Sequence, residues 1–270
     1  MTQKANRRFG QNFLIAPGIA RRIIDLAEVT SRDYVLEIGP GKGALTELLL
    51  ERKCQVWAIE IDAGLSSILQ ERYAARDGFH IVSADFLRCD LEATLDSTPP
   101  GAKWKLISNL PYNEATAILR RLIEVKDRLQ HLTVMVQREV AARLLAHPGN
   151  REIGFLTHIL GCHFEIRRGF HVGPGAFRPA PKVCSTVVQL TPRPEPLVLS
   201  DYPYYLRMLE LAFRQRRKTL PNACSALAIE SARWTELLAA MGLPPNARAE
   251  ALSVQDFAWL AGQLSPSHPL

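Results

Sequence analysis

Four consecutive residues, Asn109-Leu110-Pro111-Tyr112, are poorly suited to a hydrophobic core and well suited to holding a small polar group. They come at the end of the apolar run KLISN (105–109), which is typical of a strand, and Pro111 cannot donate to a sheet ladder, so the strand is expected to stop here. The Asn109 side-chain oxygen and the Leu110 carbonyl are neutral acceptors, which the rigid ring of Pro111 makes converge. Together they could hold the two hydrogens of an amino group, beside the flat face of Tyr112.

A glycine-rich turn is the second candidate. Gly39-Pro40-Gly41-Lys42-Gly43 follows the strand run YVLEIG (34–39) and leads into a helix expected to begin near Ala44. Glycines let the backbone turn tightly and approach a ligand closely. The G-x-G-x-G spacing matches neither the dinucleotide pattern G-x-G-x-x-G nor a Walker A loop, which needs Ser or Thr after its Lys. With Glu37 before it, the turn suits S-adenosylmethionine, which has no pyrophosphate.

Acidic residues end the next two strand runs. Glu60-Ile61 close QVWAIEI (55–61), and Asp85-Phe86 close FHIVSAD (79–85). Ligands of doubly wound folds bind at the carboxyl ends of strands, where an acid accepts hydrogen bonds from ribose hydroxyls. Glu60 fits that role, and Asp85 could accept from an adenine amino group while Phe86 packs nearby. These strand ends predict a nucleoside cofactor whose transferable group points toward Asn109.

The pattern Asn-x-Pro-aromatic resembles the signature of methyltransferases that act on amino groups of nucleobases. The exocyclic nitrogen of adenine is a poor nucleophile because its lone pair is delocalised into the ring. It loses no proton until after it has attacked, so orientation by neutral acceptors helps more than a strong base does. Neutral acceptors also form no ion pair with a cationic sulfonium. We therefore expect Asn109 to position an amino group and not to abstract a proton.

The elements that must position these residues alternate between strand and helix. Further strand runs are LTVMVQ (132–137) and, as an expected closing antiparallel pair, HFEIRRGF (163–170) and STVVQL (185–190). Apolar residues recur at helical spacing in IARRIIDLAEV, ATAILRRLIEV and REVAARLLA. This alternation predicts an α/β fold with a parallel sheet covered on both faces.

A proline-rich segment, TPRPEPLVLSDYP (191–203), marks a domain boundary, and only helical patterns follow it. We expect a cofactor-binding domain over residues 1–195 and a small all-helical domain over residues 200–270. His158 and His163, in the first of these, are expected to be structural and not catalytic.

Charge and composition narrow the class of partner. The net charge of +6 favours a polyanion, and the best phosphate candidates are the clustered cations Arg214, Arg216, Arg217 and Lys218. The five cysteines are scattered without a C-x-x-C pair, so neither a zinc site nor a disulfide framework is expected, and no other metal site is predicted. No run approaches the roughly 20 apolar residues of a membrane span, and the first residues lack the apolar segment of a secretory signal. A cytoplasmic protein that does not enter the membrane is expected.

Five motifs occur in the order of one known family. They are RFGQNFL (8–14), EIGPGKGALT (37–46), NLPYN (109–113), FRPAPKVCS (177–185) and AFRQRRKTL (212–220). Over almost its whole length the chain resembles the bacterial KsgA-type small-subunit ribosomal RNA adenine dimethyltransferases. The resemblance implies a Rossmann-like class I methyltransferase sheet with a helical C-terminal domain that binds RNA or the ribosome. It also implies S-adenosylmethionine as methyl donor, with S-adenosylhomocysteine as product.

The implied reaction is dimethylation of two adjacent adenosines near the 3′ end of 16S ribosomal RNA in a small-subunit precursor, as a step of ribosome biogenesis. Carried over by position, the family's cofactor-binding residues match Asn12, Leu14, Gly39, Glu60, Asp85 and Asn109, and the adjoining Gln11, Gly41, Ile61 and Phe86 are expected to contribute. The target-amino motif matches Asn109 to Tyr112. Phe177 matches an aromatic that stacks on a flipped adenine, although the sequence alone also allows a core residue there.

The chain departs from the family pattern at Ile15-Ala16, Glu114-Ala115 and Ile153, around the expected target pocket. Two other functions stay open. One is an adenine methyltransferase of another kind, either the antibiotic-resistance type acting on large-subunit RNA or a DNA methylase. The other is a ribosome-assembly or transcription-type binding factor without catalysis. AFRQRRKTL and the helices after it argue against the first, and the intact Asn109, Tyr112 and glycine turn argue against the second. Nothing indicates an oligomer, so a monomer is expected.

Overall fold

A computed structural model describes residues 11–99, 101–197 and 201–266. The chain divides into two compact units. The first comprises the residues up to Ala141 together with Glu165–Pro192, and the second comprises Ala142–Phe164 and the residues from Arg193 onward. Of the RFGQNFL motif, residues 8–10 lie outside the described residues.

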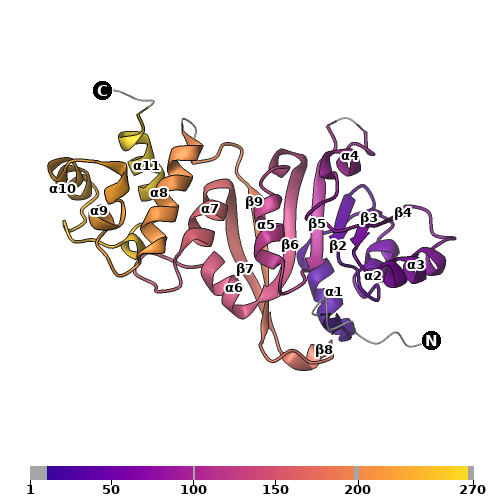
Figure 1. Ribbon diagram of the computed structural model, residues 1–270. Coiled ribbons are helices and arrows are strands. Elements are labelled where there is room, and N and C mark those ends of the chain that lie inside the picture. The colour runs from indigo at the N-terminus through magenta and orange to yellow at the C-terminus, as the bar shows by residue number, and fades with distance from the viewer. Residues whose placement is uncertain (1–10, 100, 198–200, 267–270) are drawn as a thin grey trace. The chain divides into compact units, whose positions relative to one another are not determined.

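A mostly parallel sheet forms the first unit (Figure 1). In the described part of the chain seven strands lie in the order β4-β3-β2-β5-β6-β9-β7. β2 pairs in parallel with β3 and β5, β3 with β4, and β5 with β6, whereas β9 is antiparallel to β6. Their bounds are β2 Tyr34–Ile38, β3 Gln55–Glu60, β4 Phe79–Ser83, β5 Trp104–Asn109, β6 Leu129–Gln137, β7 Phe164–Val172 and β9 Ser185–Pro192. The predicted α/β class with a parallel sheet is confirmed.

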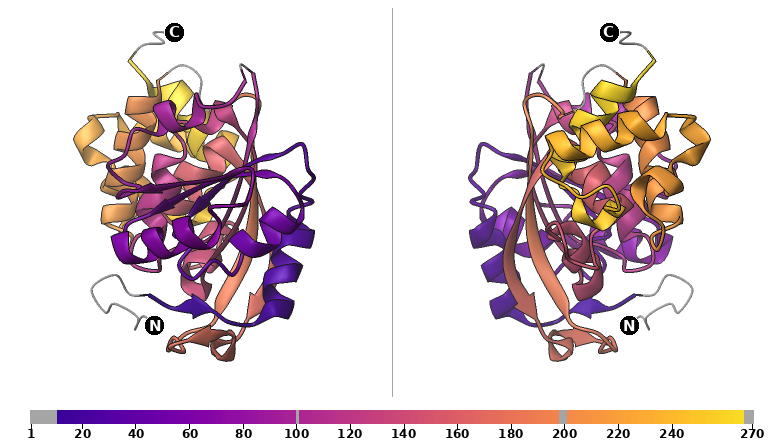
Figure 2. Two further views of the ribbon diagram at one scale, coloured as in Figure 1. Left: turned by 90° about the vertical axis from the view of Figure 1, so that its right-hand side faces the viewer. Right: turned by 90° about the vertical axis from the view of Figure 1, so that its left-hand side faces the viewer.

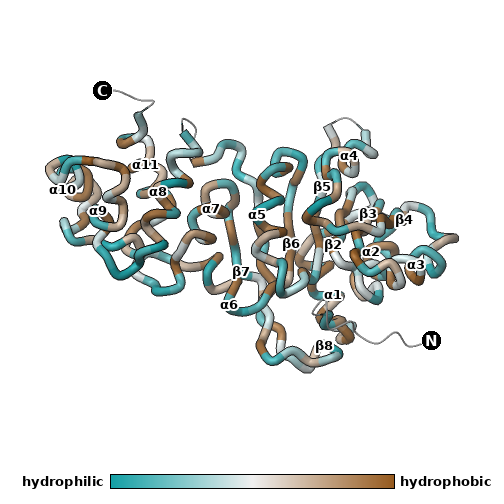
Figure 3. The backbone as a smooth tube through the Cα atoms, in the orientation of Figure 1, coloured by the Kyte–Doolittle hydropathy of each residue, from teal (hydrophilic) through white to brown (hydrophobic). Residues whose placement is uncertain are grey.

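Helices lie on both faces of this twisted sheet (Figure 2). Alternate strand residues such as Val35, Val56 and Met135 belong to one hydrophobic cluster with Ile23 and Leu69 of the helices, because successive side chains of a strand point to opposite faces. Figure 3 shows hydrophobic residues recurring along the central strands. The helices of this unit are α1 Pro17–Leu26, α2 Thr46–Glu51, α3 Ala63–Arg72, α4 Leu91–Leu95, α5 Ala115–Arg121 and α6 Arg138–Leu144, the last of which runs into the second unit, with the 3-10 helices η2 Lys126–Arg128 and η3 Pro174–Ala176.

Left-handed backbone at Gly41 and Gly43 shapes the turn between β2 and α2, where φ is +59° and +83°. A Cβ at Gly41 would lie 3.1 Å from the Phe13 ring, and one at Gly43 would lie 3.0 Å from both Leu69 and Tyr73. A side chain is therefore disfavoured twice, by conformation and by space. Helix α2 begins at Thr46, two residues after the expected start near Ala44.

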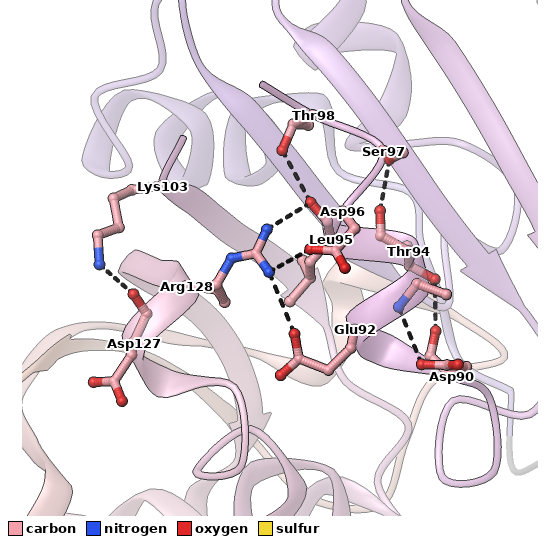
Figure 4. Close-up of polar contacts among 11 residues, drawn as sticks. Asp90, Glu92, Thr94, Leu95, Asp96, Ser97, Thr98, Lys103, Asp127 and Arg128 are labelled. Carbon is pink, nitrogen blue, oxygen red and sulfur yellow. Dashed lines mark hydrogen bonds and ion pairs between the residues drawn. The ribbon is translucent and has the colours of Figure 1, made fainter. Parts of the chain in front are cut away.

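Helix α4 is held in place by one arginine (Figure 4). The Arg128 guanidinium lies 2.7 Å from Asp96 Oδ1 and 3.3 Å from Glu92 Oε2, and it donates to the Leu95 carbonyl at 2.9 Å. Both carboxylates are mostly exposed, so these ion pairs contribute little to stability. Their effect is to fix α4 against η2, beyond the end of β4.

A two-residue strand, β1 (Phe13–Leu14), pairs antiparallel with β8 (Phe177–Arg178), and Leu14 lies opposite Phe177. The amide of Ile15 donates to the Ala176 carbonyl at 2.8 Å and extends this pairing. β1 precedes the first sheet strand by many residues, whereas β8 lies in the connection between β7 and β9. They bring the end of the RFGQNFL motif against the start of the FRPAPKVCS motif.

The second unit is helical and includes a helix that the sequence pattern assigns to the first domain. The predicted domains are 1–195 and 200–270, but helix α7 (Phe155–His163) lies in the second unit. Its residue Gly161 leaves room for Val254, and the His158 ring contacts those of Phe213 and Phe257. A helix buried on nearly every side needs neighbours all round, and α8 and α11 supply them. The helices are α7 Phe155–His163, α8 Tyr202–Arg214, α9 Leu220–Ala223, α10 Ser231–Ala240 and α11 Val254–Leu264.

Within the described ranges, no helix is long and apolar enough to span a membrane. Nor does any group of three or more His, Cys, Asp or Glu side chains in that part of the chain have the arrangement of a metal site.

Candidate active site

A cavity in the first unit lies at the carboxyl ends of β2, β3 and β5. It brings together every residue predicted to bind the cofactor and the four residues of the target-amino motif. In chain order these are Gln11, Asn12, Leu14, Gly39, Gly41, Glu60, Ile61, Asp85, Phe86, Asn109, Leu110, Pro111 and Tyr112. Phe177 is not part of the lining, and Arg214 to Lys218 belong to the other unit.

Glu60 is fixed by the backbone around it. It is only 3% exposed, and its two oxygens accept hydrogen bonds from the amides of Gly41 and Asp62, each at 3.0 Å. Burial raises the pKa of this carboxyl, and the backbone hydrogen bonds oppose the shift. Because a carboxylate has about four acceptor positions, capacity is left for donors from a ligand. The bond from Gly41 ties β3 to the glycine turn.

Glu37, the last buried acid of β2, also lines the cavity. The Thr46 hydroxyl donates to its Oε2 at 2.7 Å. Burial raises the pKa of Glu37 to about 8, against the lowering effect of Thr46, and the nearby Glu60 charge adds to the rise. Glu37 is therefore mainly protonated at neutral pH. The sequence indicated only that an acid precedes the turn and not that it would be buried there.

Asn109 has one half of its amide satisfied and the other half unsatisfied. Its Nδ2 donates to the Asn12 carbonyl at 3.3 Å, whereas its buried Oδ1 has no partner among the described residues. The Asn12 carbonyl sets the orientation of the amide, because only the NH₂ group can donate to it. A buried acceptor without a donor is destabilising and calls for an explanation. A ligand amino group in the cavity provides one.

The rest of the motif is held by neighbouring strands. The Leu110 amide donates to the Met135 carbonyl at 3.1 Å, which continues the β5–β6 pairing one residue past β5. The Tyr112 hydroxyl lies 2.5 Å from Ser185 Oγ, and its ring meets that of Phe177 edge to face at 6.4 Å between centroids. Ser185 stands at the end of a motif that the sequence singled out, but no role was predicted for it.

Phe177 lies in the core and not at the cavity. Its side chain is 3% exposed, and it belongs to the cluster that contains Leu14 and Val187. Pairing of β8 with β1 buries the ring between the two strands and the sheet. In this conformation the predicted stacking of a base on Phe177 has no room, and the ring instead supports Tyr112.

Two residues that the sequence did not single out complete the wall beside the glycine turn. The Lys42 ammonium lies 4.8 Å from the centroid of the Phe13 ring, and both residues line the cavity. Phe13 is the residue that a Cβ at Gly41 would meet. The position of Phe13 in the RFGQNFL motif was the only sequence signal for a role at the site. In a strand of two residues, the alternation of side chains between the two faces does not show which of them faces a ligand.

The end of β4 is rigid as well. Asp85 Oδ1 accepts from the Leu87 amide at 2.9 Å, and Arg121 of α5 donates to the Phe86 carbonyl at 2.5 Å. The Arg121 guanidinium also lies 5.8 Å from the centre of the Phe86 ring. Asp85 keeps Oδ2 toward the exposed Arg88 at 3.6 Å, so this carboxylate is only partly committed to the protein.

In the second unit, the predicted cationic cluster does not act as one group. Arg216 donates to the carbonyls of Arg151 and Ile153 and lies 3.7 Å from Glu250 Oε2, so its guanidinium holds a loop. All four cations, Arg216 included, are exposed. The contacts of Arg214, Arg217 and Lys218 with RNA, and any contact of Arg216 beyond its loop bonds, stay predictions.

The cavity wall fits S-adenosylmethionine. The left-handed glycines leave backbone at the cavity surface, and Glu60 and Asp85 retain acceptor capacity. Two buried carboxyl groups, Glu37 and Glu60, face a shared space, and a positive charge beside a carboxyl favours its ionised form. A sulfonium cation therefore suits this wall better than a neutral or anionic ligand.

A parallel sheet closed by an antiparallel strand, with a glycine turn and an acidic residue at successive strand ends, defines a class I methyltransferase that uses S-adenosylmethionine. The chain belongs to the ribosomal RNA adenine dimethylase family, whose model matches residues 2–264. The predicted family, enzyme class and methyl donor are thereby confirmed, and ribosomal RNA is the substrate class.

Individual relatives agree over nearly the full length. A protein of Geobacter metallireducens named ribosomal RNA small subunit methyltransferase A is 38% identical over 261 residues, covering 96% of this chain and 94% of its own. The crystal structure of a dimethyladenosine transferase from Plasmodium falciparum has a TM-score of 0.75 at 25% identity, covering 91% of this chain and 94% of that one. The 23S ribosomal RNA methyltransferase ErmE has a TM-score of 0.74 at 27% identity, covering 94% and 99%.

Proposed function

We propose that this enzyme dimethylates two adjacent adenosines near the 3′ end of 16S ribosomal RNA, in a precursor of the small ribosomal subunit. It works as a cytoplasmic monomer and takes part in small-subunit biogenesis. Support comes from the full-length similarity to relatives named for the small subunit. The observation that carries the chemistry is the buried Asn109 Oδ1 at the carboxyl end of β5, for which no described residue provides a donor.

In the proposed mechanism the protein orients the amino group. Asn109 Oδ1 accepts one amino hydrogen and the Leu110 carbonyl accepts the other, so the nitrogen lone pair is turned out of the base plane. Tyr112 stacks on the base and holds it out of the RNA helix. S-adenosylmethionine, when bound, supplies an electrophilic methyl group. The extra proton leaves only after the nitrogen has attacked, so no side chain is needed as a strong base.

The second methyl transfer follows from the same geometry. After one transfer the nitrogen keeps a single hydrogen, which needs only one of the two acceptors. The backbone carbonyl of Leu110 cannot rotate, whereas the Asn109 amide is restrained by a long hydrogen bond of 3.3 Å. We place the remaining hydrogen on the Leu110 carbonyl and the first methyl on the Asn109 side.

Methylation of large-subunit RNA is the second candidate function. It is favoured by the likeness to ErmE, whose TM-score of 0.74 nearly equals that of the dimethyladenosine transferase. The fold alone therefore does not separate the two substrates, since function resides in sites grafted onto folds. The sequence similarity to relatives named for the small subunit extends over nearly the full length of the chain, and for this reason we propose the first candidate.

A substrate panel tests the proposal. The protein is incubated with methyl-labelled S-adenosylmethionine and, separately, with unmethylated small subunits, large subunits and plasmid DNA. Label in dimethyladenosine of small-subunit RNA alone is the expected result. Label confined to large-subunit RNA or DNA would contradict the substrate, and RNA binding without any label would contradict the activity.

The exposed cations Arg217 and Lys218 give a salt-dependent prediction. Replacing Arg217 and Lys218 by alanine should weaken RNA binding and lower the slope of log affinity against log salt by about 1 per lost phosphate contact. Arg216→Ala is the matched comparison, because its guanidinium is held by the loop carbonyls of Arg151 and Ile153. We expect it to lower the melting temperature with little change in the slope. Filter binding at several salt concentrations measures the slope for each variant, and thermal denaturation measures the melting temperature. An unchanged slope in Arg217→Ala/Lys218→Ala would remove this surface from the RNA interface.

A further inference from the structure

A buried serine lies behind the aromatic residue of the target-amino motif. Ser185 is the first residue of β9, its side chain is 0% exposed, and it pairs in register with Gln137 of β6. Its Oγ lies 2.5 Å from the Tyr112 hydroxyl, and either oxygen can be the donor. This is the hydrogen bond that joins the motif after β5 to the antiparallel strand of the sheet.

The contact matters because a tyrosine ring has two free torsions. Pro111 restricts the backbone just before Tyr112, and the hydroxyl bond to Ser185 fixes the far end of the same side chain. The edge of the ring meets Phe177, at an interplanar angle of 70°. Because the Tyr112 side chain is restrained at its backbone, at its hydroxyl group and at its ring, the plane of the ring is fixed before a base binds.

Preorganisation of this kind contributes to rate and not only to stability. A flexible ring would have to be ordered when the base stacks on it, and that ordering opposes binding in the reactive orientation. A rigid ring avoids the ordering step. The base and its amino group then meet Asn109 in one orientation.

We propose that Ser185 is a positioning residue for methyl transfer, which acts by holding the Tyr112 ring in the orientation that stacks on the target base. The inference rests on the proposed function, since it assigns the base to Tyr112. It adds a residue to the reaction that touches neither the cofactor cavity nor the base.

Removal of the bond from either side tests this role. Ser185→Ala and Tyr112→Phe each delete the same hydrogen bond, and we expect each to lower kcat about tenfold, the size of one hydrogen bond. The double variant should lose no more than either single variant. Ser185→Thr keeps the hydroxyl and should recover most of the rate. The affinity for S-adenosylhomocysteine, measured by calorimetry, should stay at the wild-type value in Ser185→Ala and Ser185→Thr, because Ser185 does not line the cavity.

A spectroscopic readout separates positioning from general destabilisation. In protein with ¹³Cζ-labelled tyrosine, the signal of Tyr112 is assigned by its loss in Tyr112→Phe. Burial raises the pKa of Tyr112 and the bond to Ser185 lowers it, so Ser185→Ala should raise that pKa further.

A control comes from the next residue of β9. Thr186 points to the opposite face, where its hydroxyl bonds to His171 at 2.9 Å.

We expect Thr186→Val to transfer methyl groups at the wild-type rate and to leave the Tyr112 signal unchanged. An active wild type with an equally fast Ser185→Ala, or additive losses in the double variant, would overturn the positioning role alone. A wild type that methylates no small-subunit RNA would instead contradict the proposed function, while the Tyr112 signal would still report whether the bond exists.

Discussion

Replacing Asn109 by alanine is expected to lower the rate of methyl transfer about 100- to 1000-fold, the range found when one positioned hydrogen-bond partner is removed from a reacting group. The amide oxygen is the side-chain acceptor for the target amine, and its loss leaves the nitrogen lone pair delocalised in the base plane. Single-turnover transfer to small subunits with labelled donor measures the effect. Cofactor affinity should weaken but stay detectable, because Asn109 also lines the cavity.

The variant Asn109→Asp tests whether the side chain only has to accept a hydrogen bond from the target amino group, or must also be oriented by the Asn12 carbonyl. Aspartate has acceptors but no donor, so the Asn12 carbonyl at 3.3 Å from Nδ2 would face a carboxylate oxygen. We expect this variant to lose at least about tenfold in rate, since its side chain rotates away from the carbonyl and carries a charge. A wild-type rate in Asn109→Ala would show that the amide does not hold the amino group. A wild-type rate in Asn109→Asp would show that the Asn12 contact does not set its orientation.

The sequence predicted the parts of the site that depend on strand ends. Gly39, Glu60, Asp85 and Asn109 each follow an apolar run, and parallel strands place their carboxyl ends at one edge of a sheet. A single rule of topology was therefore enough to bring distant residues together. The same rule could not show that each oxygen of Glu60 accepts a hydrogen bond from a backbone amide, because the bond from Gly41 depends on how the glycine turn closes.

Errors and gaps arose where packing between distant segments decides the outcome. Phe177 looked available for stacking, but β8 pairs with β1, and the ring is buried. Arg216 is exposed like its neighbours, but the sequence could not show that it also donates to loop carbonyls of residues 151 and 153. The apolar pattern of α7 is the same whether it covers a sheet or a helical bundle, so sequence periodicity could not assign its unit. Ser185 shows no pattern at all, since one hydroxyl contact leaves no periodic signal.

The N-terminal strand has a part in the chemistry that its length does not suggest. β1 pairs with β8, its preceding residue Asn12 orients Asn109 through a backbone carbonyl, and β8 carries Phe177 against Tyr112. Both the acceptor and the aromatic residue of the target motif therefore depend on this small ribbon. A motif that lies far from NLPYN in the sequence thus sets the geometry of NLPYN.

The second unit is expected to lose stability steeply below about pH 6.5, the ordinary pKa of histidine. His158 is 0% exposed between the rings of Phe213 and Phe257, and neither ring nitrogen has a hydrogen-bond partner among the described residues. Burial lowers its pKa to about 3. In the unfolded chain this histidine therefore binds a proton near pH 6.5, whereas in the folded chain it binds one only near pH 3. The contribution of neutral His158 to the free energy of unfolding is fully present above pH 6.5 and decreases as the pH falls toward 3.

The size of the effect follows from the same linkage. Each pH unit below 6.5 removes about 1.4 kcal/mol, so the unit should lose about 2 kcal/mol between pH 6.5 and pH 5 from this one residue. His158→Leu removes the titrating group, and the free energy of unfolding of the variant should then vary less over that range by the same amount. Urea denaturation of the full chain, followed through hydrogen exchange of peptides from α7, α8 and α11, measures the second unit separately.

Phe213→Leu serves as the matched control, because it disturbs the same aromatic contact without removing the histidine. It should lower the free energy of unfolding by a similar amount at pH 8 and at pH 5, so the dependence of that free energy on pH should stay as in the wild type. If His158→Leu also kept the wild-type pH dependence, protons bound at other residues would be responsible for it. If Phe213→Leu reduced the pH dependence, water would reach the histidine through a loosened core, and burial away from water would not be the cause of its low pKa.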